Sequence, residues 1–173
     1  FKENELLFQN LSLHLKKGEC LGIIGKNGKG KSTLLNCLAG ELHPTEGDVS
    51  FHPLINFSHF GQTNISRLHA SNSIVQEVTE VAPDLSFSKI RQICGTMMFS
   101  GDLADKKISV LSGGEKSRVM LGKIIAKPSN LLFLDEPTNH LDMQSIESLA
   151  EAIENFDGAT VIVTHSEMLL RRL

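Results

Sequence analysis

The segment from residue 25 to residue 33 constrains the fold more than any other part of this chain. It reads Gly-Lys-Asn-Gly-Lys-Gly-Lys-Ser-Thr, which fits the spacing G-x-x-x-x-G-K-[ST]. The mostly apolar residues 19–24 before it predict a buried strand, and residues 32–39 predict a helix that Gly40 ends. A strand that continues through a glycine-rich loop into a helix presents backbone N–H groups to an anion. The sequence therefore predicts a phosphate-binding loop rather than a glycine-rich turn without function.

Two adjacent carboxylates follow a second apolar run much further along the chain. Residues 131–134 (Leu-Leu-Phe-Leu) predict a buried strand, and Asp135 and Glu136 come directly after it. A core strand alone gives no reason for this pair, because burying unpaired charge is costly. A site that binds a metal ion and activates a water molecule uses both groups. Together with the loop, the pair predicts a Mg²⁺-dependent nucleotide hydrolase, with Lys31 on the terminal phosphates and the Ser32 hydroxyl on the metal.

Composition and charge exclude several classes of protein. The chain has 173 residues, 40% of them hydrophobic, which is typical of one globular domain with its own core. Its net charge of −3 argues against a broad nucleic-acid-binding face. No apolar run reaches the roughly 20 residues that a membrane helix needs. Three scattered cysteines suit a reducing cytoplasm, and a start at Phe1 rather than Met suggests a piece of a longer protein.

The order of predicted elements indicates an α/β domain with an insertion. Short strands are expected at residues 6–8, 11–15, 48–51 and 55–60, and the fold is expected to include a small antiparallel β part. From residue 131 to 164 strand and helix alternate, which predicts a mostly parallel sheet flanked by helices. The middle is helical, with capping-box spacing at Ser73 and Gln76. We expect a single domain over 1–173, with a nucleotide-binding core at 1–66 and 128–173 and a helical lobe at 67–127.

The lobe contains a second glycine pair at a predicted helix start. In Leu-Ser-Gly-Gly-Glu at residues 111–115, Ser112 would cap the helix, and Gly113 and Gly114 would leave backbone N–H groups facing outward. Alone, this pattern is also typical of an ordinary helix start. Because the phosphate loop already provides one phosphate site, a second anion-binding helix start on a separate lobe favours contact with the nucleotide of another molecule.

Taken in order, these elements resemble those of the ATP-binding cassette (ABC) ATPases over essentially the whole chain. The matching motifs are the phosphate loop (25–33), the glutamine loop at Gln62, the signature (111–115), the strand with its two carboxylates (131–136), the D-loop (139–142) and the switch histidine His165 after the predicted strand 160–164. The resemblance implies the fold of a P-loop NTPase: an ABC-type nucleotide-binding domain with an inserted α-helical lobe. It also implies an ATPase that uses ATP and Mg²⁺ and produces ADP and phosphate.

The resemblance assigns roles residue by residue. Asp135, Ser32 and Gln62 would hold Mg²⁺, while Glu136 would polarise the attacking water and His165 would contact the γ-phosphate. The implied catalytic set is Glu136, His165, Gln62 and Lys31. The implied nucleotide-binding set is Phe1, as an adenine-stacking aromatic, with Gly25, Lys26, Asn27, Gly28, Lys29, Gly30, Lys31, Ser32 and Thr33, and, toward a facing cassette, Ser112, Gly113, Gly114, Glu115 and Asp142.

Details within the motifs indicate a subfamily. Residues 135–142 (Asp-Glu-Pro-Thr-Asn-His-Leu-Asp), the short stretch 31–62 and Glu115 resemble the ABC-F subfamily, soluble twin-cassette ATPases that act on ribosomes. The later motifs, especially residues 111–118, resemble the second cassette of such a protein. The expected partner is a second cassette, in the same chain or in a homodimer. Contacts with ribosome or RNA are expected only through segments outside this chain.

The alternative is the ATP-binding subunit of a membrane ABC transporter. There, Phe57, Phe60, Phe87 and Phe99 would line a groove for a membrane partner, although core packing explains such residues more simply. A DNA-repair or chromosome-maintenance cassette is disfavoured, because the lobe is compact and has no coiled-coil insertion.

Overall fold

A four-stranded parallel sheet organises the computed structural model, which describes residues 7–61, 67–139 and 141–173. The strand order is β1-β4-β3-β2, and all three pairings are parallel. The predicted α/β class with a parallel sheet core is confirmed. The strands are β1 (Cys20–Ile23), β2 (Phe57–Phe60), β3 (Leu131–Asp135) and β4 (Ala159–Val163).

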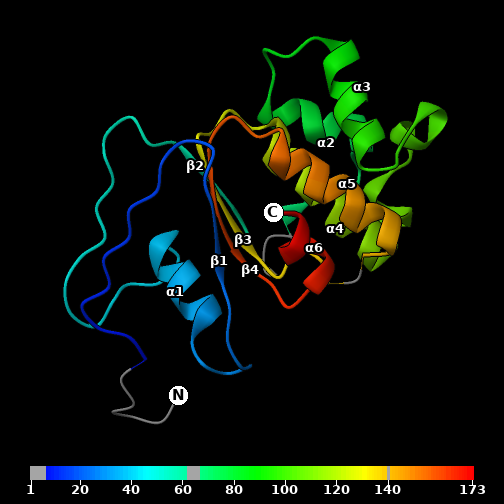
Figure 1. Cartoon of the computed structure of the whole chain (residues 1–173). Helices are drawn as coiled ribbons and strands as arrows, with labels where there is room; N and C mark the ends of the chain where they lie inside the picture. The colour runs from blue at the N-terminus through cyan, green and yellow to red at the C-terminus, as the bar shows by residue number, and fades with distance from the viewer. Residues whose placement is uncertain (1–6, 62–66, 140) are drawn as a thin grey trace.

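Helices cover both faces of this sheet (Figure 1). The helix α1 lies on one face, while α4, α5 and α6 lie on the other, with α2 and α3 beyond them. The α-helices are α1 (Lys31–Leu38), α2 (Ile74–Val81), α3 (Phe87–Thr96), α4 (Gly113–Ala126), α5 (Met143–Glu154) and α6 (Glu167–Arg172), and two short 3₁₀ helices span Gly101–Asp105 and Ile108–Val110. Among the described residues no helix is long and apolar enough to cross a membrane.

The alternation of side chains along β3 divides the interior into two cores. Leu131 and Phe133 pack with Leu35 of α1 on one face. Leu132 and Leu134 pack on the opposite face, in the larger core that the lobe helices and α5 share. A strand buried on both faces needs a continuous apolar run, which explains the sequence before Asp135.

The helix α2 begins where the sequence predicts. The Ser73 hydroxyl accepts the Gln76 N–H and the Gln76 side chain accepts the Ser73 N–H, so the expected capping box of α2 is confirmed. Ser86 caps α3 in the simpler way, by accepting the Lys89 N–H. Such caps satisfy N–H groups that have no partner within the helix.

The strand before the phosphate loop differs from the prediction. We expected residues 19–24 to be buried, but within the described part of the chain β1 pairs only with β4 and lies at the edge of the sheet. Its residues are alternately exposed and half-buried, and Ile24, which follows it, is 69% exposed. An apolar run does not distinguish an edge strand from a central one, because that depends on the pairing order.

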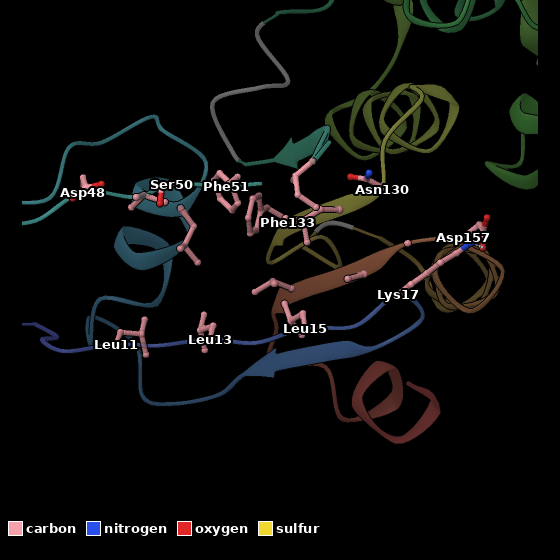
Figure 2. A pocket seen from close by; sticks show the side chains of 17 residues that line it. Leu11, Leu13, Leu15, Lys17, Asp48, Ser50, Phe51, Asn130, Phe133 and Asp157 are labelled. Carbon is pink, nitrogen blue, oxygen red and sulfur yellow. Dashed lines mark ion pairs between the residues drawn. The ribbon is translucent and has the colours of Figure 1, made fainter. Parts of the chain in front are cut away.

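The antiparallel β part is also absent from the described residues, where the sole antiparallel pairing is an isolated bridge between Ser73 and Lys107. Residues 11–15 and 48–51 are instead extended segments without strand hydrogen bonds, on either side of an apolar groove of about 750 Å³. Figure 2 shows Leu11, Leu13 and Leu15 along one side of this groove. Alternating leucines predict one-sided burial. Here all three line the groove, but Leu11 and Leu13 remain exposed, at 48% and 44%, and only Leu15 is half-buried.

Candidate nucleotide-binding site

The loop between β1 and α1 has the backbone that a phosphate-binding loop requires. Gly28 and Gly30 have φ angles of 74° and 85°, in the left-handed region that favours glycine. Gly30 is also the N-cap of α1, and no side chain caps that helix. The first N–H groups of α1 are therefore available to an anion, at the positive end of the helix dipole.

Lys31 folds back over the loop. Its Nζ donates to the carbonyl oxygens of Gly25, at 2.8 Å, and of Lys26, at 3.1 Å. These contacts keep a positive charge beside the helix start, and an ammonium has three donors to share. The predicted position of Lys31 at the phosphates is consistent with this geometry.

Ser32 and Asp135 meet although they lie 103 positions apart in the sequence. The Ser32 hydroxyl donates to Asp135 Oδ1 at 2.9 Å, and the Asp135 residue is only 6% exposed at the end of β3. Mg²⁺ prefers such hard oxygen ligands, so the two side chains fit the predicted metal site. Gln62, the third expected ligand, lies outside the described residues, as does Phe1.

Glu136 and His165 form the second pair at the same edge of the sheet, beyond β3 and β4. His165 Nε2 lies 3.4 Å from Glu136 Oε1, and the His165 N–H donates to Glu136 Oε2 at 3.3 Å. The Glu136 backbone has a φ of 47°, which is strained for a residue other than glycine. Its N–H donates to the Val163 carbonyl at 2.8 Å, which fixes the turn. Strain of this kind is concentrated at functional sites.

The signature residues form an exposed helix start on α4. Ser112 accepts the Glu115 N–H at 3.3 Å, and Glu115 Oε2 accepts the Ser112 N–H at 2.8 Å. These hydrogen bonds to Ser112 hold the pKa of Glu115 below its usual range. A Cβ at Gly113 would meet no atom within 4 Å, so the surface there is open. Glu115, expected to contact nucleotide, is placed in this structure as a helix cap.

Asp142 of the D-loop is the N-cap of α5. It accepts the Ser145 N–H at 2.8 Å and an Arg118 Nη1 donor at 3.3 Å. Hydrogen bonds from Ser145, and then the charge of Arg118, hold its pKa below the usual range. The carboxylate that was expected at a seam between cassettes is thus tied to α4 within this chain.

Arg118 is a residue of this site that sequence reasoning missed. Its guanidinium donates to the Ser145 hydroxyl at 3.0 Å and lies 5.2 Å from the centre of the Phe99 ring. In the sequence, its only mark is a cation directly before the apolar Val119 in a predicted helix. Val119 is buried in the structure. Arg118 links the helix that follows the signature to the D-loop.

The phenylalanines expected to line a partner groove are mostly in the core. Phe60 and Phe99 are buried, and Phe57 packs edge-on against Phe133. Phe87 alone of the four is largely exposed, at 63%, with the Arg91 guanidinium over its ring. Core packing is the better description for three of the four.

A parallel sheet, a glycine loop at a helix start and carboxylates at adjacent strand ends define an ATPase-type nucleotide-binding domain. The family model described as ABC transporter matches residues 8–139, and the chain belongs to this family.

Its similar relatives include ABC-F proteins. The chain is 39% identical over 97% of its length to the Probable ATP-binding protein YheS of Escherichia coli K12, covering 26% of that protein. It is 38% identical over 99% of its length to ABC transporter F family member 2 of Arabidopsis thaliana, covering 25%. It is 36% identical over 95% of its length to ATP-binding cassette sub-family F member 3 of Mus musculus, covering 23%. The chain thus spans about a quarter of the length of these relatives.

A solved structure gives the same fold. The complex of archaeal ribosomal stalk protein aP1 and archaeal ribosome recycling factor aABCE1 matches with a TM-score of 0.76 and 25% identity. The match covers 91% of this chain and 31% of that one. The fold is therefore shared with that archaeal recycling factor.

Proposed function

We propose that this chain binds ATP with Mg²⁺ and hydrolyses it to ADP and phosphate when paired head to tail with a second cassette. The proposal rests on two pairs of side chains that meet at one edge of the sheet: Ser32 with Asp135, and Glu136 with His165. Both pairs lie where β3 and β4 end, next to the loop that would hold the phosphates.

In this reaction the chain supplies position and charge. The N–H groups of residues 25–33 and the Lys31 ammonium bind the phosphates, and Ser32 and Asp135, together with Gln62, would hold Mg²⁺. When bound, Mg²⁺ neutralises part of the charge on the β- and γ-phosphates. Glu136 orients a water and accepts its proton as the oxygen attacks the γ-phosphorus and the bond to the bridging β–γ oxygen breaks. His165, beside Glu136, donates to a γ-phosphate oxygen and keeps the water in line.

Pairing is needed because one cassette lacks a second helix start on the γ-phosphate. The exposed start of α4, at Ser112, Gly113 and Gly114, provides that element to a facing cassette. Its backbone N–H groups and dipole would stabilise the charge that develops during phosphoryl transfer.

Mixed pairs test this arrangement. Lys31→Ala should abolish hydrolysis of the nucleotide bound to the chain's own phosphate loop. Ser112→Arg should block hydrolysis of the nucleotide bound to the phosphate loop of the facing cassette. A mixture of the two variants should recover turnover, because one intact composite site can form. Each variant alone, at the same total concentration, is the control. Absence of recovery in the mixture would contradict composite sites.

We further propose that the chain is the second cassette of a cytoplasmic ABC-F type protein associated with translation. The relatives from Arabidopsis and mouse support this, and the archaeal neighbour is by its description a ribosome recycling factor in complex with a stalk protein. ATP-dependent co-sedimentation of the full protein carrying Glu136→Gln with purified ribosomes is the test. No association with ribosomes in the presence of ATP would contradict the assignment.

The transporter alternative has one supporting observation, the exposed Phe87 on the lobe. An apolar side chain there could receive a helix of a membrane partner. Phe87→Ala should leave ribosome association unchanged under the ABC-F proposal. Under the transporter alternative, the same change would weaken capture by a membrane protein.

A further inference from the structure

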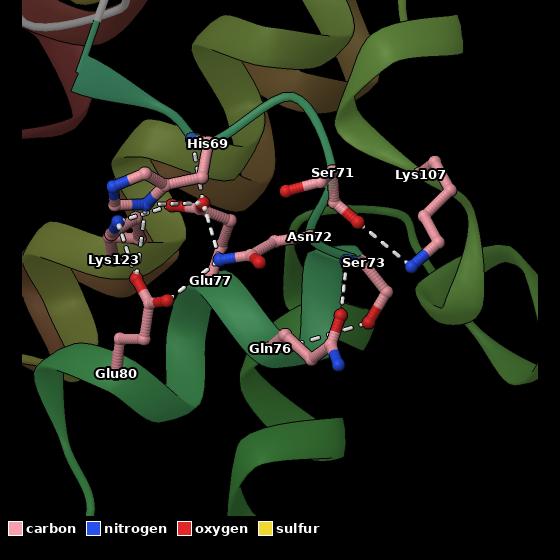
Figure 3. Close-up of polar contacts among 9 residues, drawn as sticks. All are labelled: His69, Ser71, Asn72, Ser73, Gln76, Glu77, Glu80, Lys107 and Lys123. Carbon is pink, nitrogen blue, oxygen red and sulfur yellow. Dashed lines mark hydrogen bonds and ion pairs between the residues drawn. The ribbon is translucent and has the colours of Figure 1, made fainter.

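The helical lobe contains a carboxylate with no exposed surface. Glu77, on α2, is 0% exposed, and side chains from separate parts of the lobe surround it (Figure 3). Lys123 reaches it from α4, and His69 and Asn72 reach it from the segment before α2. None of the roles described above uses this group.

Both oxygens of Glu77 are engaged. Oε2 accepts a hydrogen bond from Lys123 Nζ, while Oε1 accepts the His69 N–H at 2.8 Å and an Asn72 Nδ2 donor at 3.1 Å. Burial opposes ionisation of Glu77, but the bonds from Lys123 and from the His69 N–H hold its pKa below the usual range. Glu77 and Lys123 are therefore a buried pair of charges with fixed geometry.

The cluster is not a metal site in this form. Ligand atoms of His69, Glu77 and Glu80 lie within 4.8 Å of one another, which alone would suit a cation. The Lys123 ammonium already bonds Glu77 and lies 3.9 Å from Glu80 Oε2. It supplies the positive charge that these carboxylates need, so a structural role fits better.

The pair joins two segments that matter to the proposed reaction. On one side is the segment from Arg67 to Asn72, which precedes α2. Arg67 Nη2 lies 3.2 Å from Glu41 Oε1, shortly after the end of α1. On the other side is α4, which begins at Gly113 beside Ser112 and carries Lys123 near its end. A helix transmits displacement along its length, so a shift at Lys123 moves the exposed start of α4.

We propose that the Glu77–Lys123 pair is a positioning device that sets α4 against the segment 67–72, and thereby sets the reach of Ser112 and Gly113 toward the nucleotide of a facing cassette. The inference rests on the proposed function, in which that helix start acts on a partner. A hydrogen-bonded ion pair specifies one arrangement of its two elements, whereas apolar contact tolerates sliding. Glu77 and Lys123 are positioning residues, since neither touches substrate.

Two backgrounds of the full protein, with the facing cassette intact, separate positioning from mere stability. With Lys31→Ala in this chain, the remaining turnover comes from the facing cassette's nucleotide, which this chain's α4 covers. With Ser112→Arg, the remaining turnover comes from the nucleotide on this chain's own loop. Lys123→Met should lower turnover about tenfold or more in the first background and change it less than about twofold in the second. Lys127→Met, an exposed lysine next to the end of α4, is the matched control and should change neither.

A double variant covers the case in which Lys123→Met alone fails to fold. Glu77→Leu with Lys123→Met leaves no unpaired charge, and it should restore the melting temperature. It should retain the selective loss of turnover in the Lys31→Ala background, because a leucine side chain at that position cannot accept the His69 N–H.

Three results would overturn the inference. Equal loss of turnover in both backgrounds would mean that the pair is only structural, as would recovery of both stability and turnover in the double variant. If neither background retains turnover before Lys123 is changed, the paired-site proposal fails, and the positioning role falls with it.

Discussion

The carboxylate of Glu136 meets His165 in the core and that of Glu77 meets Lys123 in the lobe, and the different surroundings of the two pairs suit them to different roles. The Glu136 side chain is 16% exposed, has a strained backbone, and meets a histidine that is 44% exposed. The Glu77 side chain is fully buried on a regular helix and meets a lysine that is 10% exposed. The first pair leaves room for water and substrate. The second is fully engaged and fixes two elements instead.

The largest expected effect concerns the core pair. Glu136→Gln should lower ATP turnover about 10²- to 10⁴-fold, because an amide cannot accept the proton of the attacking water. Binding of ATP should persist, since the phosphate loop is unchanged, and a paired form should accumulate. Phosphate release and retention of labelled ATP measure the two effects. Glu167→Gln, at an exposed position, is the control. Normal turnover in the Glu136→Gln variant would contradict the assignment of Glu136 as the base.

The next effect concerns the stability of the lobe pair. Lys123→Met should lower the free energy of unfolding by about 3–5 kcal/mol, because it leaves Glu77 buried and unpaired. Denaturant unfolding measures this. The exposed Lys127→Met should stay within about 0.5 kcal/mol of the original chain. An equal loss of unfolding free energy in both variants would mean that the buried pair stabilises the fold no more than an exposed lysine does.

The pH dependence of unfolding tests the lobe pair further. The pKa of Glu77 is lowered in the fold, so its contribution to stability is present above its unfolded pKa, about 4.3, and is lost as the pH falls through the folded pKa. Glu77→Gln should therefore have a shallower loss of melting temperature on acidification below about pH 5 than the original chain. Thermal unfolding between about pH 3 and 7 checks this. Glu80→Gln, at an exposed position, is the matched comparison, and equal slopes in both variants would contradict the assignment.

The smallest effects compare two serine caps of the same design. Ser73→Ala and Ser112→Ala each remove a capping-box hydroxyl, and each should cost about 1 kcal/mol of stability. Only Ser112→Ala should also lower turnover in a paired protein, because only that helix start is proposed to contact a partner's nucleotide. Matched unfolding curves and phosphate-release assays measure the difference. Equal turnover in the two variants would argue that the signature serine acts as a cap and nothing more.

Much of the core site could be predicted from the sequence. The phosphate loop requires left-handed backbone at fixed places, so its glycines mark it directly, and Gly28 and Gly30 have that backbone. Asp135 follows an apolar run that predicts a buried strand, and its meeting with Ser32 agrees with the parallel strand topology.

Within the described residues, the strands predicted at 11–15 and 48–51 and the burial predicted for 19–24 were wrong for a shared reason, whereas the strand predicted at 55–60 is confirmed as β2. A pattern of apolar residues indicates which faces of a segment are apolar. It does not indicate whether the backbone N–H and C=O groups form hydrogen bonds to a neighbouring strand. Residues 11–15 place their leucines on a groove and form no ladder, and β1 pairs on one side only.

By itself, the sequence determined the loop, the helix starts and the strand that ends in two carboxylates, because each depends on short-range backbone and capping requirements. The tertiary structure alone decided which charges meet. Arg118 reaches Asp142 across 24 positions, and Lys123 reaches Glu77 across 46. Such pairings depend on how helices pack around a shared core, and no local pattern encodes the distance between two helix faces.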